Sequence, residues 1–290
     1  MSLLVCGANG QIGRELAAAA GSTALALGRG QLDITDAAAV ARVLREQRPR
    51  VVINAAAYTA VDKAESEPQR AQAVNADGAA NLAAACAEVG AALLHISTDY
   101  VFDGRKSSAY SESDTANPQG AYARSKWLGE ERVRALCPRH FILRVSWVFG
   151  IHGGNFVKTI LRLARERTEL RVVADQLGAP THAGAVAAAL LTLAQRVEER
   201  AELSWGTCHY SGTPVISWHG FATHIVDEAF ALGLVARRIP VLPITTAEFP
   251  LPAPRPANSA FDLSRARALG LQVQPWQDGL HKVLTEIRKQ

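Results

Sequence analysis

The sequence predicts an α/β fold, in which a doubly wound parallel sheet is followed by a smaller C-terminal α/β lobe. In the first half, short apolar runs alternate with Ala-rich amphipathic stretches, the pattern of parallel strands joined by crossover helices. The expected strands, buried on both faces, are residues 3–6, 23–27, 51–53, 93–97 and 141–145. A glycine-rich turn directly follows the first run, at the edge where such sheets bind ligands.

Helix caps and breakers mark the stretches between and beyond these strands. Asp36 is expected to cap a helix that ends near Arg48, and Asp77 is expected to cap a helix that ends at Gly90. After Gly150 the connections lengthen and a second lobe begins. The elements expected there are helices at 155–167, 217–232 and 276–289, a strand at 170–174, and an Ala-rich helix from about Ala183.

The chain divides into two regions at about residue 150. The first region is expected to span residues 1–150 and to be rejoined by a return at about 170–198, and the second region spans 151–290. Six of the 13 prolines fall between Pro240 and Pro256. Because proline has no backbone N–H to donate, this stretch is expected to form a stiff loop and neither a strand ladder nor a helix.

The composition excludes several classes of protein. With 290 residues and 48% hydrophobic content, the chain can bury a substantial core. Its 31 Lys and Arg and 27 Asp and Glu are spread without a basic tract, so we expect anionic small molecules and not nucleic acid as partners. No leader is expected, and the longest weakly polar stretch, 183–194, is too short for a membrane helix. Four scattered cysteines indicate reduced thiols in a cytoplasm.

The turn after the first strand has the spacing GxxGxxG and opens a helix. It reads Gly7-Ala8-Asn9-Gly10-Gln11-Ile12-Gly13, and it lies where the pyrophosphate of a dinucleotide would meet free backbone N–H groups. Gly7 is expected to allow the tight turn, Gly10 the approach of the phosphates, and Gly13 the packing of helix on strand. An ordinary strand-to-helix turn is the alternative, but the position at the start of the first β-α-β unit favours a Rossmann-like dinucleotide site.

The end of the second expected strand bears on the choice of cofactor. NAD-selective sites usually hold an acidic residue there for the ribose 2′-hydroxyl, whereas this chain reads Leu27-Gly28-Arg29. Arg29 can face a 2′-phosphate, so NADPH is favoured and NADH stays open; a solvated surface arginine is the alternative. The small side chains of Ala55, Ala56 and Ala57 after the third strand would let the cofactor lie against the backbone.

A phenol and an ammonium are placed four residues apart in Tyr122-Ala123-Arg124-Ser125-Lys126, hence on one face of the helix expected after Gly120. The cation of Lys126 is expected to favour the ionised form of Tyr122 and so to lower its pKa toward neutral pH. Thr98 follows the fourth strand and brings a hydroxyl to the same edge of the sheet. A half-buried tyrosine beside a solvated lysine is the alternative, but the glycine turn, Thr98 and YxxxK occur in the order that a reductase needs.

These motifs resemble those of the extended short-chain dehydrogenase/reductases and, within them, the dTDP-4-dehydrorhamnose reductase family. The resemblance spans nearly the whole chain. Besides the glycine turn and YxxxK, it rests on residues 54–65 (NAAAYTAVDKAE), 97–104 (STDYVFDG), 144–150 (RVSWVFG), 154–157 (GNFV), 175–181 (DQLGAPT) and 255–259 (RPANS). The run 58–65 and the last two motifs are more diagnostic than the glycines.

The resemblance implies an oxidoreductase that reduces the C4 keto group of dTDP-4-dehydro-L-rhamnose to give dTDP-L-rhamnose, a sugar donor for lipopolysaccharide and O-antigen biosynthesis. Hydride would come from NADPH or NADH while Tyr122 protonates the alkoxide, with Thr98 and Lys126 stabilising it. The second region would then be the nucleotide-sugar substrate domain. The residues expected at the cofactor are Gly7, Gly10, Gln11, Ile12, Gly13, Arg29, Asp33, Ile34, Ala55, Ala56, Ala57, Tyr58, Thr59, Ile96, Tyr122 and Lys126. The residues expected at the substrate are Thr98, Asp99, Trp147, Asn155 and Arg255.

The same resemblance allows a Mg²⁺ ion at a carboxylate-built dimer contact, with Glu15 as one candidate ligand. After Thr181 the chain provides no carboxylate before Glu198, so no metal site is predicted. A homodimer is an open expectation. For Trp147, core packing is the alternative to a substrate contact.

Three other functions stay open at this point. A related epimerase or dehydratase would act on another nucleotide sugar with tightly held NAD⁺, which it would regenerate in each cycle. A non-catalytic regulatory subunit could share the fold, although the intact Thr98, Tyr122 and Lys126 argue against it. A general carbonyl reductase for small ketones would share the same three residues, but a second lobe favours a large anionic substrate.

Overall fold

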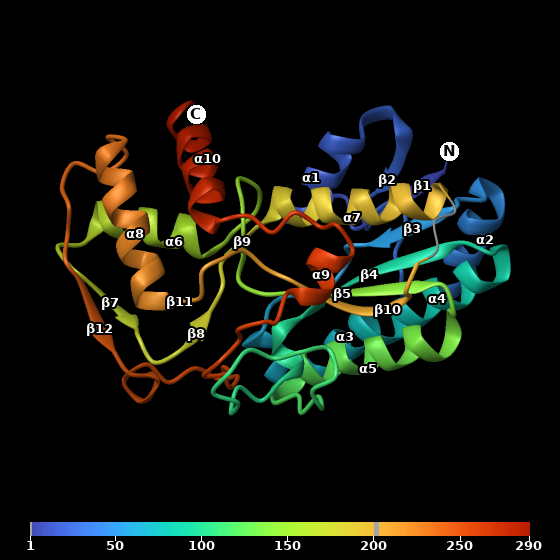
Figure 1. Ribbon diagram of the computed structural model, residues 1–290, viewed down its shortest axis with the longest axis horizontal. Coiled ribbons are helices and arrows are strands. Elements are labelled where there is room, and N and C mark those ends of the chain that lie inside the picture. Colours follow the sequence, from blue (N-terminus) through green and yellow to red (C-terminus); the bar gives the residue numbers. More distant parts are fainter. Residues whose placement is uncertain (1, 200–202) are drawn as a thin grey trace.

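Six parallel strands form the central sheet of the computed structural model, which describes residues 2–199 and 203–290 (Figure 1). They are β1 (Leu3–Cys6), β2 (Ala24–Leu27), β3 (Val51–Asn54), β4 (Ala92–Thr98), β5 (His140–Val145) and β10 (Gly206–Tyr210). Their order is β10-β5-β4-β3-β1-β2, and every neighbouring pair is parallel. The chain order reverses between β1 and β3, which opens a crevice at their carboxyl ends. The predicted α/β fold with a parallel sheet is confirmed.

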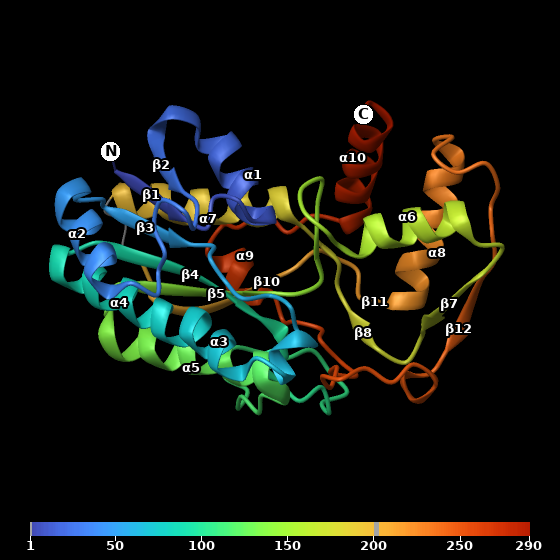
Figure 2. The same cartoon turned by 180° about the vertical axis from the view of Figure 1, so that it is seen from behind.

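Helices cover both faces of this sheet. On one face, α1 (Gln11–Ala20) and α7 (Ala183–Glu198) pack against each other and bury Leu16 and Leu190 on the strands. On the other face, α2 (Ala37–Gln47), α4 (Gly78–Val89) and α5 (Gly120–Leu136) bury Leu44 and Leu82. Figures 1 and 2 show the sheet between these two layers. Because both faces are covered, β1 and β3 are buried along their whole length, as their apolar runs predicted.

The predicted cap at Asp36 is confirmed, whereas the one at Asp77 is wrong. Asp36 accepts a hydrogen bond from the backbone N–H of Ala39 at 2.9 Å. Asp77 has helical backbone angles and makes no capping hydrogen bond, because the helix begins earlier, at α3 (Pro68–Gln72), and continues through a π-helical turn (Ala73–Asp77) into α4. Its carboxylate pairs with Arg132 on α5 instead. A π-helical turn inside a longer helix is frequently found at a functional site.

The second region packs three helices against one another, on the left in Figure 1. They are α6 (Phe156–Glu166), α8 (Trp218–Ala231) and α10 (Trp276–Arg288), around a core that includes Phe221, Ile225 and Trp276. Beside them, β7 (Leu170–Val173) pairs with β12 (Val241–Ile244), and β8 (Leu177–Gly178) pairs with β11 (Ile216–Ser217). Asn155 and Ser217 cap α6 and α8 with their side chains.

The return of the chain to the first region begins later than expected. Within the expected return at 170–198, β7 and β8 pair with strands of the second region. Only β9 (Thr181–His182), which pairs with β6 (Val148–Phe149), and then α7 lead back. The sixth strand, β10, follows α7 and pairs with β5. The sequence did not predict this strand, because Thr207 and His209 interrupt the apolar run that is typical of a buried strand.

The proline-rich stretch contains a strand, which corrects the expectation of a stiff loop throughout 240–256. The carbonyls of Pro240 and Ile244 accept hydrogen bonds from Leu170 and Ala174, so the even-numbered residues of β12 face β7. The backbone nitrogen of Pro243, which carries no hydrogen, therefore faces away from β7, where a two-stranded sheet needs no donor.

In the part of the chain that the structure describes, none of the helices is long and apolar enough to cross a membrane.

Candidate active site

A cleft runs along the carboxyl ends of β1, β3 and β4, at the crevice where the strand order reverses. It consists of two adjoining cavities of about 220 and 520 Å³ that share Asn9 and Gly10 of the glycine turn and the alanines at 55–57. Of the expected cofactor residues, the smaller cavity is lined by Gly7, Gly10, Arg29, Asp33, Ile34, Ala55, Ala56, Ala57 and Tyr58. Of the expected cofactor and substrate residues, the larger cavity is lined by Gly10, Gln11, Ile12, Ala55, Ala56, Ala57, Thr59, Ile96, Thr98, Asp99, Tyr122, Lys126 and Trp147.

The three glycines of the first turn differ in what a side chain would meet. Gly7 has φ +85°, and a Cβ there would lie 2.5 Å from the backbone nitrogen of Ala56. A Cβ on Gly13 would lie 2.1 Å from the carbonyl oxygen of Gly7, so this glycine lets α1 pack on β1. Gly10 is different, because its nearest protein atom would lie 3.4 Å away, an ordinary contact. The protein itself does not need glycine at position 10, whereas a phosphate that approaches the start of α1 would.

Two arginines lie at the smaller cavity. Arg29 is largely exposed, and its Nε lies 3.1 Å from the carboxylate of Asp33. Hydrogen bonds from the backbone and side chain of Thr35 lower the pKa of Asp33, with burial opposing them. Arg70, which the sequence did not single out, also lines this cavity, and its guanidinium lies 5.9 Å from the centre of the Tyr58 ring. This end of the cleft therefore offers two cations for a phosphate group.

The larger cavity brings Thr98, Tyr122 and Lys126 together, as their sequence order predicts. Tyr122 and Lys126 lie one turn apart on α5, and Thr98 ends β4. All three are buried, and the ammonium of Lys126 donates a hydrogen bond to the carbonyl of Ile96 at 2.7 Å. The hydroxyl of Thr98 donates to the carboxylate of Asp99 at 3.0 Å.

The electrostatics of Tyr122 correct one expectation from the sequence. We expected Lys126 to lower the pKa of Tyr122, but burial raises it to about 12, with the neighbouring hydroxyl of Thr98 opposing the rise. Burial also lowers the pKa of Lys126 to about 8, with the charge of Glu130 opposing the fall. At neutral pH Tyr122 is therefore a protonated phenol, a proton donor and not a base.

A buried polar layer lies under α5, and the sequence did not reveal it. Arg144 on β5 donates two hydrogen bonds from Nε and Nη2 to Glu130, at 2.9 and 2.7 Å, and both side chains are buried. Although burial acts to raise it, hydrogen bonds and the charge of Arg144 hold the pKa of Glu130 below its usual value. His209 on β10 lies 3.3 Å from Arg144, and burial lowers the pKa of this imidazole to about 3.

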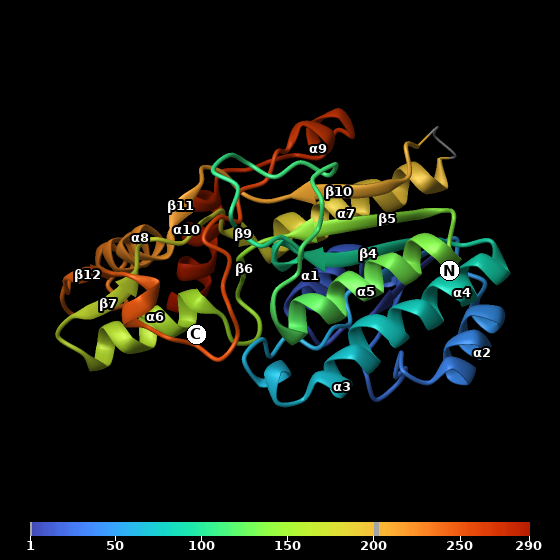
Figure 3. The same cartoon turned by 90° about the horizontal axis from the view of Figure 1, so that it is seen from below.

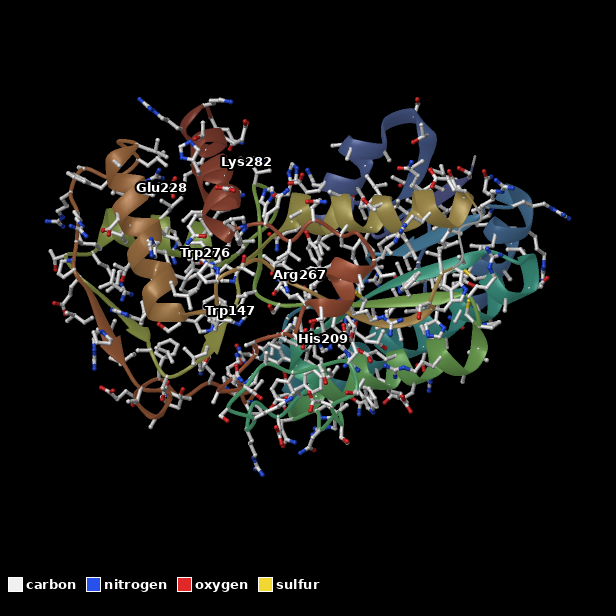
Figure 4. All side chains as sticks on the ribbon, viewed as in Figure 1. Trp147, His209, Glu228, Arg267, Trp276 and Lys282 are labelled. Carbon is white, nitrogen blue, oxygen red and sulfur yellow. The ribbon has the colours of Figure 1, made fainter. Side chains whose placement is uncertain are left out.

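Asp99 and Trp147, which follow the neighbouring strands β4 and β5, line the same cavity. Burial raises the pKa of Asp99 to about 6, and among the described residues its Oδ2 has no hydrogen-bond partner. Trp147 has φ +48°, unusual for a bulky residue and found mainly at functional sites. Its ring stacks on Trp218 at 3.5 Å, and Figure 4 shows it between the two regions. Gly178 makes room for it, since a Cβ there would lie 2.4 Å from the indole.

Three of the expected site residues do not line either cavity. Gly13 lies beneath the turn. Asn155 caps α6, and its amide nitrogen donates to Gly150 at 2.7 Å and to the side chain of Gln11 at 3.0 Å. Arg255 pairs with Asp62 at 2.7 Å. Among residues 2–199 and 203–290, no group of three or more His, Cys, Asp and Glu could hold a metal ion.

Comparison with known proteins agrees with this geometry. The family model described as the RmlD substrate binding domain matches residues 1–289. A dTDP-4-dehydrorhamnose reductase of Aggregatibacter actinomycetemcomitans is 44% identical over 97% of each chain. The chain belongs to this reductase family. A second member, from Mycobacterium tuberculosis, is 42% identical over 97% of this chain and 92% of its own.

Solved structures of similar fold fall into two groups that differ in sequence identity to this chain. The dTDP-4-dehydrorhamnose reductase of Bacillus anthracis, solved in complex with NADP, matches with a TM-score of 0.90 and 38% identity over 98% of each chain. The UDP-glucose 4-epimerase of Thermotoga maritima matches with a TM-score of 0.80 but only 17% identity, over 100% of this chain and 99% of its own. The epimerase therefore shares the fold alone, whereas the reductases share both fold and sequence.

The glycine turn generates a test that separates binding from folding. We expect Gly10→Ala to weaken NADPH binding by about tenfold or more, since the methyl group would occupy the approach to α1. Its melting temperature is expected to fall only slightly, because position 10 is the N-cap of α1 and alanine caps a helix less well than glycine. Gly13→Ala is the matched variant, and we expect it to lower the melting temperature because its Cβ meets the Gly7 carbonyl. Fluorescence titration with NADPH and thermal unfolding measure the two effects. Undiminished NADPH binding by Gly10→Ala would contradict this role of the turn.

Proposed function

We propose that this chain reduces the C4 keto group of dTDP-4-dehydro-L-rhamnose to dTDP-L-rhamnose, with NADPH or NADH as the reductant and NADPH preferred. The observation that carries the proposal is the convergence of Thr98, Tyr122 and Lys126 in the cavity that the glycine turn also lines. Reductases of this name that match over nearly their whole length support the substrate. A cytoplasmic location and a homodimer, both expected from the sequence, stay predictions.

The residues of the cleft fit a dinucleotide at both of its ends. The free N–H groups at the start of α1, with Gly10 before them, suit the pyrophosphate. Arg29 and Arg70 suit a 2′-phosphate, which supports the preference for NADPH. When bound, the reduced nicotinamide supplies a hydride to the carbonyl carbon.

The side chains of this chain supply the proton and stabilise the charge. The phenol of Tyr122, protonated because its pKa is about 12, donates its proton to the carbonyl oxygen. Thr98 lines the same cavity, and its hydroxyl provides a second polar group for the carbonyl oxygen. The ammonium of Lys126, fixed on the Ile96 carbonyl, stabilises the phenolate that proton transfer leaves.

Asp99 and Trp147 are assigned to the sugar. The free Oδ2 of Asp99 can accept a hydrogen bond from a sugar hydroxyl, which would remove the cost of a buried unpaired oxygen. The indole of Trp147 offers an apolar face to the ring. Asn155 and Arg255 stay predicted substrate residues, and each contacts a neighbour of the cleft: Asn155 holds Gln11, and Arg255 lies over Tyr100.

The substrate can be tested with a panel of ketones. We expect the purified protein to oxidise NADPH stoichiometrically with dTDP-4-dehydro-L-rhamnose, and simple ketones to react far more slowly, since they cannot bind to the second region. Simple ketones that react as well as the nucleotide sugar would exclude the substrate assignment. Reaction without net oxidation of NADPH would indicate an epimerase.

The role of Tyr122 can be tested with a single variant. Tyr122→Phe is expected to lower kcat by about 100- to 10,000-fold while NADPH still binds, because the general acid is lost. Full cellular function of Tyr122→Phe would indicate a regulatory subunit.

The buried ammonium predicts a pH dependence. The pKa of Lys126 is lowered to about 8, so its charge is present below that pH and lost above it. We expect kcat/KM, which reports on the free enzyme, to fall as the pH rises through about 8. Tyr122, with a pKa of about 12, stays protonated over the same range and does not contribute. A pH profile of kcat/KM that is flat up to about pH 10 would show that the charge of Lys126 is not required.

A further inference from the structure

A segment of the second region crosses to the first region beside the catalytic helix. We call residues 250–258 the strap; it follows the short helix η5 (Thr246–Glu248). At its end, the side-chain amide of Asn258 donates to the carbonyls of Lys106 at 2.7 Å and Ser108 at 2.9 Å. Gly104 lies so close that a Cβ there would be 2.5 Å from the backbone nitrogen of Ala257. Figure 3, the view from below, shows the side of the molecule on which loops of the two regions meet.

The middle of the strap is held by the carboxylate of Asp62. Its Oδ1 accepts from the backbone N–H of Ala253 at 3.2 Å, and its Oδ2 accepts from the guanidinium of Arg255 at 2.7 Å. The same guanidinium lies 5.9 Å from the centre of the Tyr100 ring. The Arg255 side chain is 15% exposed and that of Asp62 is 39% exposed, so this ion pair is half-buried and solvent screens it less than it screens a fully exposed pair.

Glu65, in the same short segment as Asp62, contacts the start of α5. Its Oε1 accepts from the backbone N–H of Ala121 at 2.6 Å, directly before Tyr122. Gly120 has φ +80°, and a Cβ there would lie 2.7 Å from this Oε1 and 3.2 Å from Cδ of Pro254. The carboxylate of Glu65, the strap and the first turn of α5 therefore meet at one point.

A second route joins the strap to the catalytic tyrosine. The ring of Tyr100 packs edge-on against the ring of Tyr122, with centroids 5.7 Å apart and an angle of 83° between the planes. Arg255 lies over Tyr100, so the strap contacts the residue that packs directly on the phenol. The position of Tyr122 thus depends on its helix, which Glu65 caps, and on its ring neighbour, which the strap covers.

We propose that Asp62 and Glu65 are positioning residues for the reaction, an inference that rests on the proposed function. Asp62 holds Arg255 and the strap against Tyr100, and Glu65 holds the first turn of α5. Neither carboxylate lines the cavity that contains Tyr122. Through these contacts, the position of the proton donor Tyr122 depends on how the second region packs against the first.

Variants of Glu65 test the cap. Glu65→Ala removes the acceptor for Ala121, and we expect kcat to fall by about five- to tenfold while Kd for NADPH changes by less than about twofold. Glu65→Gln keeps an acceptor oxygen, and we expect it to restore most of kcat. Glu131→Ala is the control, since it removes an exposed carboxylate from α5 itself and is expected to keep wild-type kcat. Wild-type kcat in Glu65→Ala, or a loss confined to NADPH binding, would overturn the role of Glu65.

A double-mutant cycle tests the pair in the strap. We expect Asp62→Ala and Arg255→Ala each to lower kcat, and the double variant to lose no more than the poorer single variant, because the two residues act as one unit. Effects on kcat that multiply would show that the residues act separately, and would overturn the role of Asp62.

Hydrogen exchange, measured without substrate, provides a readout that does not depend on turnover. We expect Asp62→Ala to speed amide exchange both in the strap and in the first turn of α5, because the two are in contact through Pro254 and Gly120. Faster exchange in the strap alone would overturn the coupling. A wild-type protein that never oxidises NADPH with the nucleotide sugar would instead refute the proposed function, and the exchange result would still decide the coupling.

Discussion

The hydrogen bond from the buried ammonium of Lys126 to the carbonyl of Ile96 fixes helix α5 on the end of β4, and the geometry of the site depends on it. One turn further along α5, Glu130 receives two hydrogen bonds from Arg144 on β5. Burying such charges costs several kcal/mol per ion unless each is paired and hydrogen-bonded. A shift of the helix would separate Lys126 from the Ile96 carbonyl and Arg144 from Glu130 in the interior, so these contacts also fix the position of Tyr122.

Burial shifts the pKa values of Tyr122 and Lys126 in opposite directions, and both shifts suit one direction of the proposed reaction. It favours the neutral form of each, so Tyr122 keeps its proton at neutral pH while the pKa of Lys126 falls to about 8. A protonated phenol beside an ammonium can give a proton to a developing alkoxide and can be stabilised as a phenolate afterwards. Arg255 of the second region lies over Tyr100, which packs against Tyr122, so the fold connects the region proposed to hold the nucleotide sugar with the proposed proton donor.

Local patterns in the sequence predicted what depends on local structure. The buried strands of the first region, the cap at Asp36 and the meeting of Thr98, Tyr122 and Lys126 at one sheet edge all follow from apolar runs, spacing and strand order. The predictions that were wrong concern features that depend on residues far away in the sequence. His209 can occupy a buried strand because it meets Arg144. Tyr122 has a raised pKa because Tyr58, Val61 and Tyr100, which lie far from it in the sequence or on another element, help to bury it. Asp77 reads as a cap but lies inside a helix that begins at Pro68, and Pro243 is tolerated only because β12 pairs on the side away from it.

The central claim is that the phenol of Tyr122 gives its proton to the C4 oxygen of the sugar. A crystal structure of the protein with NADP⁺ and dTDP-L-rhamnose, the product of the proposed reaction, tests it most directly. The account predicts that Oη of Tyr122 lies at about 2.6–3.2 Å from the C4 oxygen, with Thr98 beside it and Lys126 still at the Ile96 carbonyl. A C4 oxygen that points away from Tyr122, with another acidic group within hydrogen-bond distance, would contradict it.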